Sequence, residues 1–129
     1  MTPLTNPQVR IGFIGCGGIS HWHVQRLAKA PEAKIVALCD NSPASLERMV
    51  SRFPELAELP RFSDYHELLC ADLAIDGVQL HSPHTLHFQQ EMDSLDAGKH
   101  VLSEKPMVCT VEHAHRLLRK IEESGKVFA

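Results

Sequence analysis

Two spacings of apolar residues alternate along this chain, and together they predict strands that alternate with helices. Short apolar runs are typical of strands, and apolar residues that recur every three or four positions are typical of the buried face of a helix. The predicted strands cover residues 9–14, 35–39, 61–62, 77–80 and 100–102, and another begins at residue 127. Because short turns join these elements, the pattern predicts right-handed crossovers and a parallel sheet with helices on both faces.

Most of the predicted helices have a recognisable start and an apolar stripe. Ser42, Ser63 and Thr110 are predicted N-caps, and a further helix begins near Thr85. The side chains expected to face the core are Ser20, Val24 and Leu27, then Leu46, Met49, Val50 and Phe53, then Phe88, Met92 and Leu95, and finally Ala114, Leu117, Leu118 and Ile121. The fold class that follows is α/β, a doubly wound parallel sheet in a three-layer α/β/α arrangement.

The composition is that of one ordinary globular domain. The chain has 129 residues, of which 43% are hydrophobic and 22% are charged, which is enough to form a single core. Its formal net charge is −3 and its 13 Lys and Arg residues are scattered, which argues against binding to nucleic acid or to an anionic membrane. We therefore treat residues 1–129 as one domain.

The sequence predicts neither export nor insertion into a membrane. Residues 1–10 are polar and contain proline, without the apolar centre of a signal peptide, and no apolar run reaches the length of a membrane span. The four cysteines lack C-x-x-C spacing and are expected to be reduced and mostly buried. Together these features predict a cytoplasmic protein.

The segment Gly15-Cys16-Gly17-Gly18-Ile19-Ser20, hereafter the glycine turn, joins the first predicted strand to the first predicted helix. Its first glycine permits a tight turn, its second lets the main chain approach a pyrophosphate, and the helix N-terminus offers unpaired N–H groups to the anion. Ser20 replaces the last glycine of the usual fingerprint, on the packed face of the helix. A glycine-rich turn without a ligand is the alternative, but the strand-turn-helix context favours a dinucleotide site on a Rossmann fold.

Asp40 ends the second predicted strand, 20 residues after Ser20, where a carboxylate can accept hydrogen bonds from an adenosine ribose. The same carboxylate repels the 2′-phosphate of NADP, and Asn41, Ser42 and Pro43 supply no cation to offset it. Arg48, on the following helix, is still able to turn toward this point. The sequence therefore predicts NAD as the cofactor, with NADP less favoured.

Further candidate residues follow the next strands. Ser82-Pro83-His84 comes after the fourth predicted strand, and Glu104-Lys105-Pro106 comes after the fifth. In an open parallel sheet, ligands bind beyond the carboxyl ends of the strands, where the strand order reverses. We therefore expect the glycine turn, Asp40 and these two segments along one edge of the sheet.

On these residues the sequence resembles the N-terminal domain of the Gfo/Idh/MocA oxidoreductases over nearly its whole length. The motifs that carry the resemblance are the glycine turn with His23, Cys39-Asp40, Ser82-Pro83-His84 with His87, and residues 97–107, which contain Glu104-Lys105-Pro106. The resemblance implies a cofactor domain that works in hydride transfer between a nicotinamide and a sugar, polyol or related hydroxyl compound.

The resemblance also implies roles for single residues. Lys105 is expected to be the catalytic residue, because an ammonium beside a carbonyl can polarise it or pass a proton. Glu104 is expected to orient the loop rather than act as the base, and a cis peptide bond before Pro106 is expected to fix the turn. A solvated surface lysine is the alternative for Lys105. The residues expected to bind the cofactor are Gly15, Gly17, Gly18, Ile19, Asp40, Ser82, His84, His87, Glu104 and Lys105.

Nine histidines raise the alternative of a metal site. His81, His84 and His87 are spaced by three, but they fall on a strand end, a proline turn and a helix start, without a carboxylate pair nearby. Zinc needs three or four converging ligands. The sequence therefore predicts no metal site.

Members of this family are longer than this chain, and a second domain lines their substrate pocket and supplies an Asp-x-x-x-His pair that works with the lysine. We therefore expect the C-terminal substrate domain to be absent from this chain, and the isolated chain to bind NAD without turning over substrate. A non-catalytic nucleotide-binding or scaffold module is the alternative, since a fold alone does not guarantee function. Without the second domain, this chain should expose apolar surface and leave a sheet edge incomplete. Both features predict a homo-oligomer.

Overall fold

The computed structural model describes residues 7–129, and residues 1–6 of the polar start discussed above lie outside the described residues. All strand pairs in the sheet are parallel, and the spatial order of the strands is β3-β2-β1-β4-β5. The predicted doubly wound parallel sheet is therefore confirmed. The strands are β1 (Val9–Ile14), β2 (Ala33–Cys39), β3 (Arg61–Phe62), β4 (Gly77–Leu80) and β5 (His100–Ser103).

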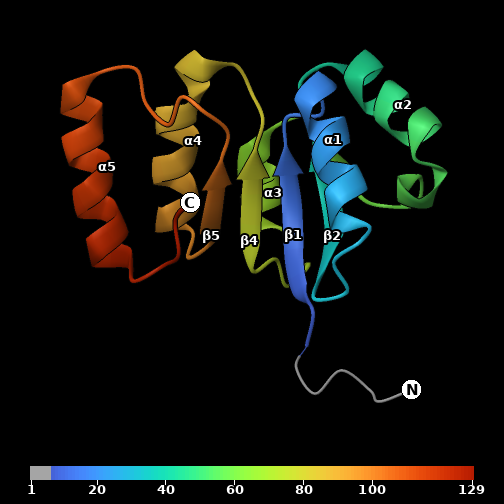
Figure 1. The fold of residues 1–129 in the computed structure, drawn as a ribbon, viewed down its shortest axis with the longest axis horizontal. Coiled ribbons are helices and arrows are strands. Elements are labelled where there is room, and N and C mark those ends of the chain that lie inside the picture. Colours follow the sequence, from blue (N-terminus) through green and yellow to red (C-terminus); the bar gives the residue numbers. More distant parts are fainter. Residues whose placement is uncertain (1–6) are drawn as a thin grey trace.

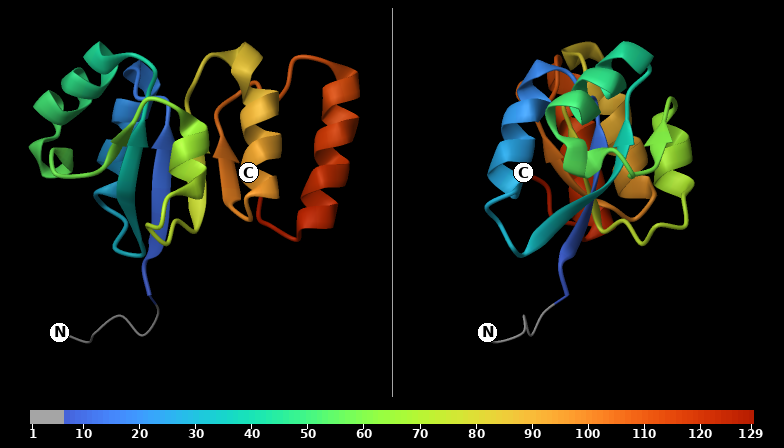
Figure 2. Two further views of the ribbon diagram at one scale, coloured as in Figure 1. Left: turned by 180° about the vertical axis from the view of Figure 1, so that it is seen from behind. Right: turned by 90° about the vertical axis from the view of Figure 1, so that its right-hand side faces the viewer.

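Helices cover both faces of the sheet, as Figures 1 and 2 show. The helices are α1 (Gly18–Leu27), α2 (Pro43–Arg52), the 3₁₀ helix η1 (Pro54–Leu56), α3 (Tyr65–Cys70), α4 (His84–Asp96) and α5 (Val111–Ser124). α1 and α2 lie on one face, α3 and α4 lie on the other, and α5 packs beside α4 at one end of the sheet. The predicted three-layer α/β/α arrangement is thus confirmed. None of the helices formed by residues 7–129 combines the length and apolar character needed to cross a bilayer.

Two apolar clusters, one on each face of the sheet, form the core. Side chains alternate along β1, so Phe13 packs with α1 and α2 whereas Ile14 packs with α3, α4 and α5. Both side chains are almost fully buried, and each contributes about 2 kcal/mol to the hydrophobic stabilisation. This packing fixes β1 between its neighbours, and with it the position of the glycine turn at the end of β1.

The helix caps agree with the sequence at two positions and differ at a third. Ser42 and Thr110 each accept a hydrogen bond from the N–H group three residues further on, which confirms both predicted caps. The cap predicted at Ser63 is wrong by one residue, because Asp64 caps α3 and accepts from the N–H group of His66. Serine and aspartate are comparable as N-caps, so the sequence alone does not rank two adjacent candidates.

The buried face of α4 differs from the predicted apolar stripe. Leu95 is buried, but Phe88 and Met92 are only partly buried. Polar side chains take the most deeply buried positions on this helix, namely His87, Gln90, Glu91 and Ser94. Several of them face hydroxyl groups and main-chain carbonyls at the ends of β4 and β5, so their burial is compatible with their polarity.

Two other predictions of burial are wrong. Leu118 is 53% exposed, because α5 packs against α4 along a narrow stripe in which Leu117 is the fully buried residue. Cys70 and Cys109 are also exposed, whereas the other two cysteines are buried as predicted, and all four are free thiols. The strand predicted to begin at residue 127 is represented by an isolated parallel bridge between Phe128 and Val101.

Candidate functional site

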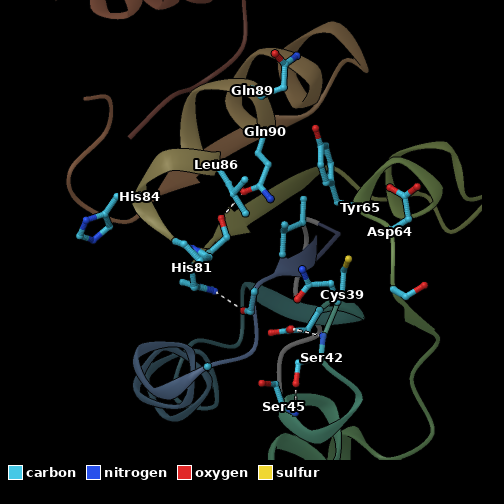
Figure 3. A pocket seen from close by; sticks show the side chains of 18 of the residues that line it. Cys39, Ser42, Ser45, Asp64, Tyr65, His81, His84, Leu86, Gln89 and Gln90 are labelled. Atoms are coloured by element: carbon cyan, nitrogen blue, oxygen red, sulfur yellow. Dashed lines mark hydrogen bonds between the residues drawn. The ribbon is translucent and has the colours of Figure 1, made fainter. Parts of the chain in front are cut away.

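A cleft of about 740 Å³ opens at the carboxyl ends of the strands, where the strand order reverses between β1 and β4. This is where an open parallel sheet binds ligands. Figure 3 shows side chains from several strands and helices converging on it. The predicted cofactor residues that line the cleft are Gly15, Gly17, Ile19, Asp40, Ser82 and His84. The residues that the sequence did not single out as cofactor ligands include Ser45, Asp64, Tyr65, His81, Gln89 and Gln90.

Gly15 occupies a position that only glycine fits. Its φ is +94°, in the left-handed region that residues with a Cβ avoid. A Cβ there would lie 2.7 Å from the main-chain carbon of His81 and 2.7 Å from the main-chain nitrogen of Ser82. The turn therefore packs directly against the backbone that leaves β4, as the sequence motif predicted for its first glycine.

Gly17 and Gly18 occupy open space instead. No heavy atom outside the immediate backbone lies within 4 Å of where their Cβ atoms would be. Gly17 caps α1 without any side-chain hydrogen bond, and no acidic residue stands in the first turn of α1. The first-turn N–H groups of a helix lack partners within the helix. The glycine turn thus leaves room and unpaired donors for an anion, which fits the pyrophosphate of a dinucleotide.

Ser20 lies on the packed face of α1, as predicted, and is fully buried. Its hydroxyl donates a hydrogen bond to the main-chain oxygen of Gly17 at 2.5 Å. A serine at this position therefore satisfies its own polar group inside the turn. The departure from the usual glycine is thereby accommodated.

Asp40 has a structural task in addition to the predicted one. One carboxylate oxygen accepts the N–H group of Cys16 at 2.8 Å, and the other accepts the N–H group of Ser42 at 2.8 Å. Each oxygen of an ionised carboxylate can accept more than one hydrogen bond, so a ribose hydroxyl can still be bound. Asp40 therefore holds the glycine turn against the start of α2 while facing the cleft.

The far wall of the cleft comes from α3 and α4. The phenol of Tyr65 donates to the carboxylate of Asp93 at 2.5 Å, and burial together with this carboxylate raises the pKa of Tyr65. The hydroxyl of Ser82 donates to Gln90, also on α4. No sequence pattern predicted that Tyr65 and Gln90 line the cleft, because their position there follows from how α3 packs against α4.

His81 joins the two sides of the cleft. Its Nδ1 lies 3.2 Å from the main-chain oxygen of Gly15, and its ring meets Phe13 edge-on and stacks on His23. Burial lowers the pKa of His81 to about 4, with a smaller contribution in the same direction from His23. His81 is therefore a neutral, buried side chain at neutral pH. His84, by contrast, is exposed, and its ring lies apart from the other labelled side chains in Figure 3.

Residues 104–107, hereafter the Lys105 turn, follow β5 beside the cleft but do not line it. Lys105 is exposed, and the peptide bond between it and Pro106 is cis, which confirms that prediction. Glu104 accepts a hydrogen bond from Nε2 of His23 at 2.9 Å, and this bond is the main cause of the lowered pKa of Glu104. The main-chain N–H of Glu104 also donates to the oxygen of Leu80 at 3.0 Å.

His87 lies behind the cleft instead of lining it. Its side chain is fully buried on α4, and its two ring nitrogens face main-chain oxygens, one in Ser82 and one in Pro106. His87 therefore lies next to the backbone of the predicted cofactor loop without lining the cleft, and its role as a cofactor residue stays a prediction. Among residues 7–129, no group of three or more His, Cys, Asp or Glu side chains converges as a metal site requires.

Comparison with known proteins agrees with this geometry. A protein family described as "Oxidoreductase family, NAD-binding Rossmann fold" matches residues 9–129. The chain belongs to the Gfo/Idh/MocA family. The Gfo/Idh/MocA chain described here is thus an NAD-binding Rossmann domain of an oxidoreductase family, as the sequence motifs predicted.

Several known proteins are similar to this chain over most of its length. Glycosyl hydrolase family 109 protein 1 of Bacteroides fragilis is 32% identical over 131 residues, which cover 95% of this chain and 28% of that protein. The solved WlbA dehydrogenase of Bordetella pertussis, in complex with NADH and UDP-GlcNAcA, is 30% identical with a TM-score of 0.83, covering 94% of this chain and 36% of that one. The apo scyllo-inositol dehydrogenase of Lactobacillus casei is 30% identical with a TM-score of 0.85, covering 97% and 36%. The chain spans about a third of the length of these relatives.

Proposed function

We propose that this domain binds NAD(H) across the cleft and supplies the cofactor half of an oxidoreductase that acts on a hydroxyl group of a sugar, polyol or related compound. The observation that carries this proposal is the open space at Gly17 and Gly18 in front of the uncapped start of α1. A pyrophosphate placed there would meet main-chain donors at the positive end of the helix dipole.

The rest of the cofactor follows from this anchor. The adenosine ribose would lie at Asp40, whose carboxylate oxygens face the cleft at the end of β2. The nicotinamide would lie on the other side of the glycine turn, toward Ser82 and the Lys105 turn. The bound cofactor supplies hydride transfer, and Lys105, Glu104, His84 and His87 are proposed to act around it.

Lys105 is the proposed catalytic residue. Its ammonium group is exposed beside the cleft, where it can donate a hydrogen bond to the reacting oxygen of a substrate and pass a proton as that oxygen changes between hydroxyl and carbonyl. Glu104, already bonded to His23, is a positioning residue in this proposal. The similarity to a scyllo-inositol dehydrogenase, and to the WlbA dehydrogenase solved with NADH and UDP-GlcNAcA, supports a hydroxyl substrate of this class.

The cleft also supports NAD over NADP. Asp40 and Asp64 are the charged residues in the lining that residues 7–129 provide, and that lining contains no Lys or Arg. A 2′-phosphate at the adenosine ribose would therefore meet a carboxylate without a cation in the cleft. Arg48 is the cation that favours the opposite choice, because its guanidinium donates to the hydroxyl of Ser45, which lines the cleft, at 3.1 Å.

Calorimetric titration with NADH and NADPH tests this proposal. We expect NADH to bind the wild-type chain, and we expect Gly17→Val to weaken binding by about a hundredfold, or about 2.7 kcal/mol, because the valine side chain fills the space in front of α1. Gly17→Val should lower the unfolding midpoint only slightly, since that space is empty and the cost is that of a poorer N-cap. A wild-type chain that binds neither cofactor would refute the proposal, and unchanged binding in Gly17→Val would refute the position of the pyrophosphate.

A second candidate function is hydrolysis of a glycosidic bond. It is favoured by one observation, the 32% identity to a protein named as a glycosyl hydrolase over 95% of this chain. In either case we propose that residues 9–129 hold the cofactor and that residues outside this chain line the substrate pocket. Assays of the full-length protein separate the two candidates, because a dehydrogenase forms NADH in proportion to product whereas a glycosidase releases a free sugar. Cofactor binding without either reaction would favour a non-catalytic module.

We infer that the partners are small molecules and other copies of this chain, in a reducing, cytoplasmic setting. The four free cysteines support the setting. Leu102 on β5 and Val127 beside it are 38% and 66% exposed, and apolar surface next to a sheet edge favours self-association. A monodisperse monomer in light scattering across a wide concentration range would contradict a homo-oligomer.

A further inference from the structure

His87 makes two hydrogen bonds that a neutral histidine cannot make together. Its Nδ1 lies 2.9 Å from the main-chain oxygen of Pro106, and its Nε2 lies 2.8 Å from the main-chain oxygen of Ser82. A carbonyl oxygen accepts hydrogen bonds and never donates them, and a neutral imidazole carries one N–H group. Both bonds therefore form only when both ring nitrogens carry a hydrogen, which makes the ring an imidazolium.

A buried cation needs a counter-charge, and α4 provides a candidate one turn further on. Glu91 is fully buried, and its Oε1 accepts from the hydroxyl of Ser103 at 2.6 Å. Its Oε2 has no hydrogen-bond partner among the described residues. Burial raises the pKa of Glu91, while Ser103 and the charge of His87 act in the opposite direction. The pKa of Glu91 is raised overall, so burial by itself favours the neutral acid, and a cation at His87 acts to keep the carboxylate ionised.

The titratable groups near His87 among the described residues include two histidines, and Lys105 directly precedes the Pro106 oxygen that faces Nδ1. The ring of His84 lies 5.8 Å away between centroids, and His81 lies at the end of β4. His81 stays neutral at neutral pH because burial lowers its pKa to about 4. His81 therefore adds no charge that opposes a positive ring at His87 in that range.

We propose that His87 is a positioning residue that remains doubly protonated at neutral pH and, with Glu91 as its counter-charge, ties the Lys105 turn to the segment at Ser82. One of its bonds ends on the residue directly after Lys105, and the other ends on a residue of the cleft wall. The consequence for catalysis rests on the proposed function, because that function is what places Lys105 beside the nicotinamide. The protonation state of the ring does not depend on it.

Nitrogen-15 NMR of the histidine side chains in the unliganded chain tests the protonation state. At about pH 7.5, one unit above the ordinary histidine pKa, we expect proton-bearing Nδ1 and Nε2 signals from the ring of His87. Its signals are assigned by their loss in His87→Gln. A ring with one protonated and one bare nitrogen at this pH would overturn the proposal.

Two substitutions at the other end of α4 test the counter-charge. Glu91→Gln removes the charge and keeps the size of the side chain, and we expect it to leave His87 with a single N–H group at the same pH. Ser103→Ala is the matched control, because it removes the hydrogen bond to Glu91 without removing the charge, and His87 should keep both hydrogens. Two N–H groups retained in a folded Glu91→Gln protein would show that Glu91 is not the counter-charge.

A matched pair of substitutions tests whether the two hydrogen bonds of His87 hold the Lys105 turn to the segment at Ser82. The amide nitrogen of asparagine lies near the position of Nδ1 and that of glutamine near the position of Nε2, so His87→Asn keeps the bond to Pro106 and His87→Gln keeps the bond to Ser82. We expect amide hydrogen exchange to rise about tenfold at the released segment and to stay slow at the retained one. Equal exchange at both segments in both variants would overturn the tie. Titration of the wild type with NADH reports on the proposed function separately.

Discussion

The glycine turn and the Lys105 turn follow strands of the same sheet, but different kinds of contact hold them in place. In the glycine turn, main-chain groups of the turn make the contacts: Gly15 packs on the backbone of His81 and Ser82, and the main-chain N–H of Cys16 donates to the carboxylate of Asp40. In the Lys105 turn, side chains from distant helices do it, with His23 of α1 on Glu104 and His87 of α4 on Pro106.

This difference explains why backbone rules alone predicted the role of the glycine turn, whereas the roles of single residues in the Lys105 turn came from the family resemblance. A turn that is held by main-chain contacts requires particular residue types at fixed spacing, and glycine at a positive φ is the clearest example. A side-chain tie between distant helices requires only that two groups meet after folding. Substitutions and acid should therefore affect the two turns differently, with the largest loss of stability at Gly15 and the smallest at Glu104.

Gly15→Ala is expected to have the largest effect and to disturb both turns together. The new Cβ would sit at a φ of +94° and 2.7 Å from the backbone that follows β4. We expect the free energy of unfolding to fall by about 3 to 4 kcal/mol, measured by urea denaturation. Gly98→Ala is the control, because Gly98 also has a positive φ, +76°, but no atom within 4 Å of its Cβ position. It should cost only about 1 kcal/mol, and equal losses in the two variants would contradict the close packing at Gly15.

Acid should destabilise the fold through His81. The ring of His81 contacts Gly15 of the glycine turn and stacks on His23, which is the partner of Glu104 in the Lys105 turn. Burial holds the pKa of His81 near 4 in the folded chain, whereas an unfolded histidine titrates near 6.5. As the pH falls from about 6.5 to about 4, the unfolded state gains a proton that the folded state does not bind, so stability is lost in that window, by up to roughly 3 kcal/mol. His81→Asn should flatten the dependence of the urea midpoint on pH. The exposed His115→Asn should leave it unchanged, and a wild-type slope in His81→Asn would contradict this account.

Substitutions at Asp40 should separate its structural hydrogen bonds, to Cys16 and Ser42, from its effect on the choice between NAD and NADP. Asp40→Ala removes both acceptors, for Cys16 and Ser42, whereas Asp40→Asn keeps one oxygen. We expect losses of about 2 kcal/mol for alanine and about 1 kcal/mol for asparagine in the free energy of unfolding. Both variants lose the negative charge, so both should raise the affinity for NADPH relative to NADH in calorimetry. A ratio that stays at the wild-type value would show that this carboxylate does not select the cofactor.

Much of the fold and one half of the site were readable from the sequence. The positions of the strands, the turn at Gly15 and the position of Asp40 follow from spacing and backbone rules that act locally along the chain. The tie between His23 and Glu104, and the places of Tyr65 and Gln90 in the cleft wall, were not readable, since they depend on how helices far apart in the sequence pack.

The polar face of α4 shows the same limit from the opposite direction. An apolar stripe at helical spacing predicted that Phe88 and Met92 face inward, yet Glu91 and its polar neighbours are the more deeply buried. Hydrophobic periodicity assumes that the surface under a helix is apolar. Here the helix lies over strand ends that offer hydroxyls and carbonyls, so a fully buried carboxyl group can be accommodated at a position where sequence patterns predict leucine or valine.

The tie between Glu104 and His23 should have the smallest effect on stability. The hydrogen bond from His23 lowers the pKa of Glu104, so its stabilisation is present above the unfolded pKa near 4.5 and is lost as the pH falls through the folded value. Both side chains are partly exposed, 18% and 26%, so solvent screens the pair, and we expect a coupling below about 1 kcal/mol in a double-mutant cycle of His23→Gln and Glu104→Gln at neutral pH.

The same cycle repeated below the lowered pKa of Glu104 should give a smaller coupling, because a protonated Glu104 no longer accepts a charge-assisted hydrogen bond. Arg61 and Glu47 provide the control pair, since their ion pair of 2.9 Å lies at the other end of the sheet and does not involve a histidine. If Glu104 and His23 contributed as much as Gly15, the Lys105 turn would be part of the folding core. A weak coupling instead means that side-chain ties set the position of a turn whose strand is already fixed by the sheet.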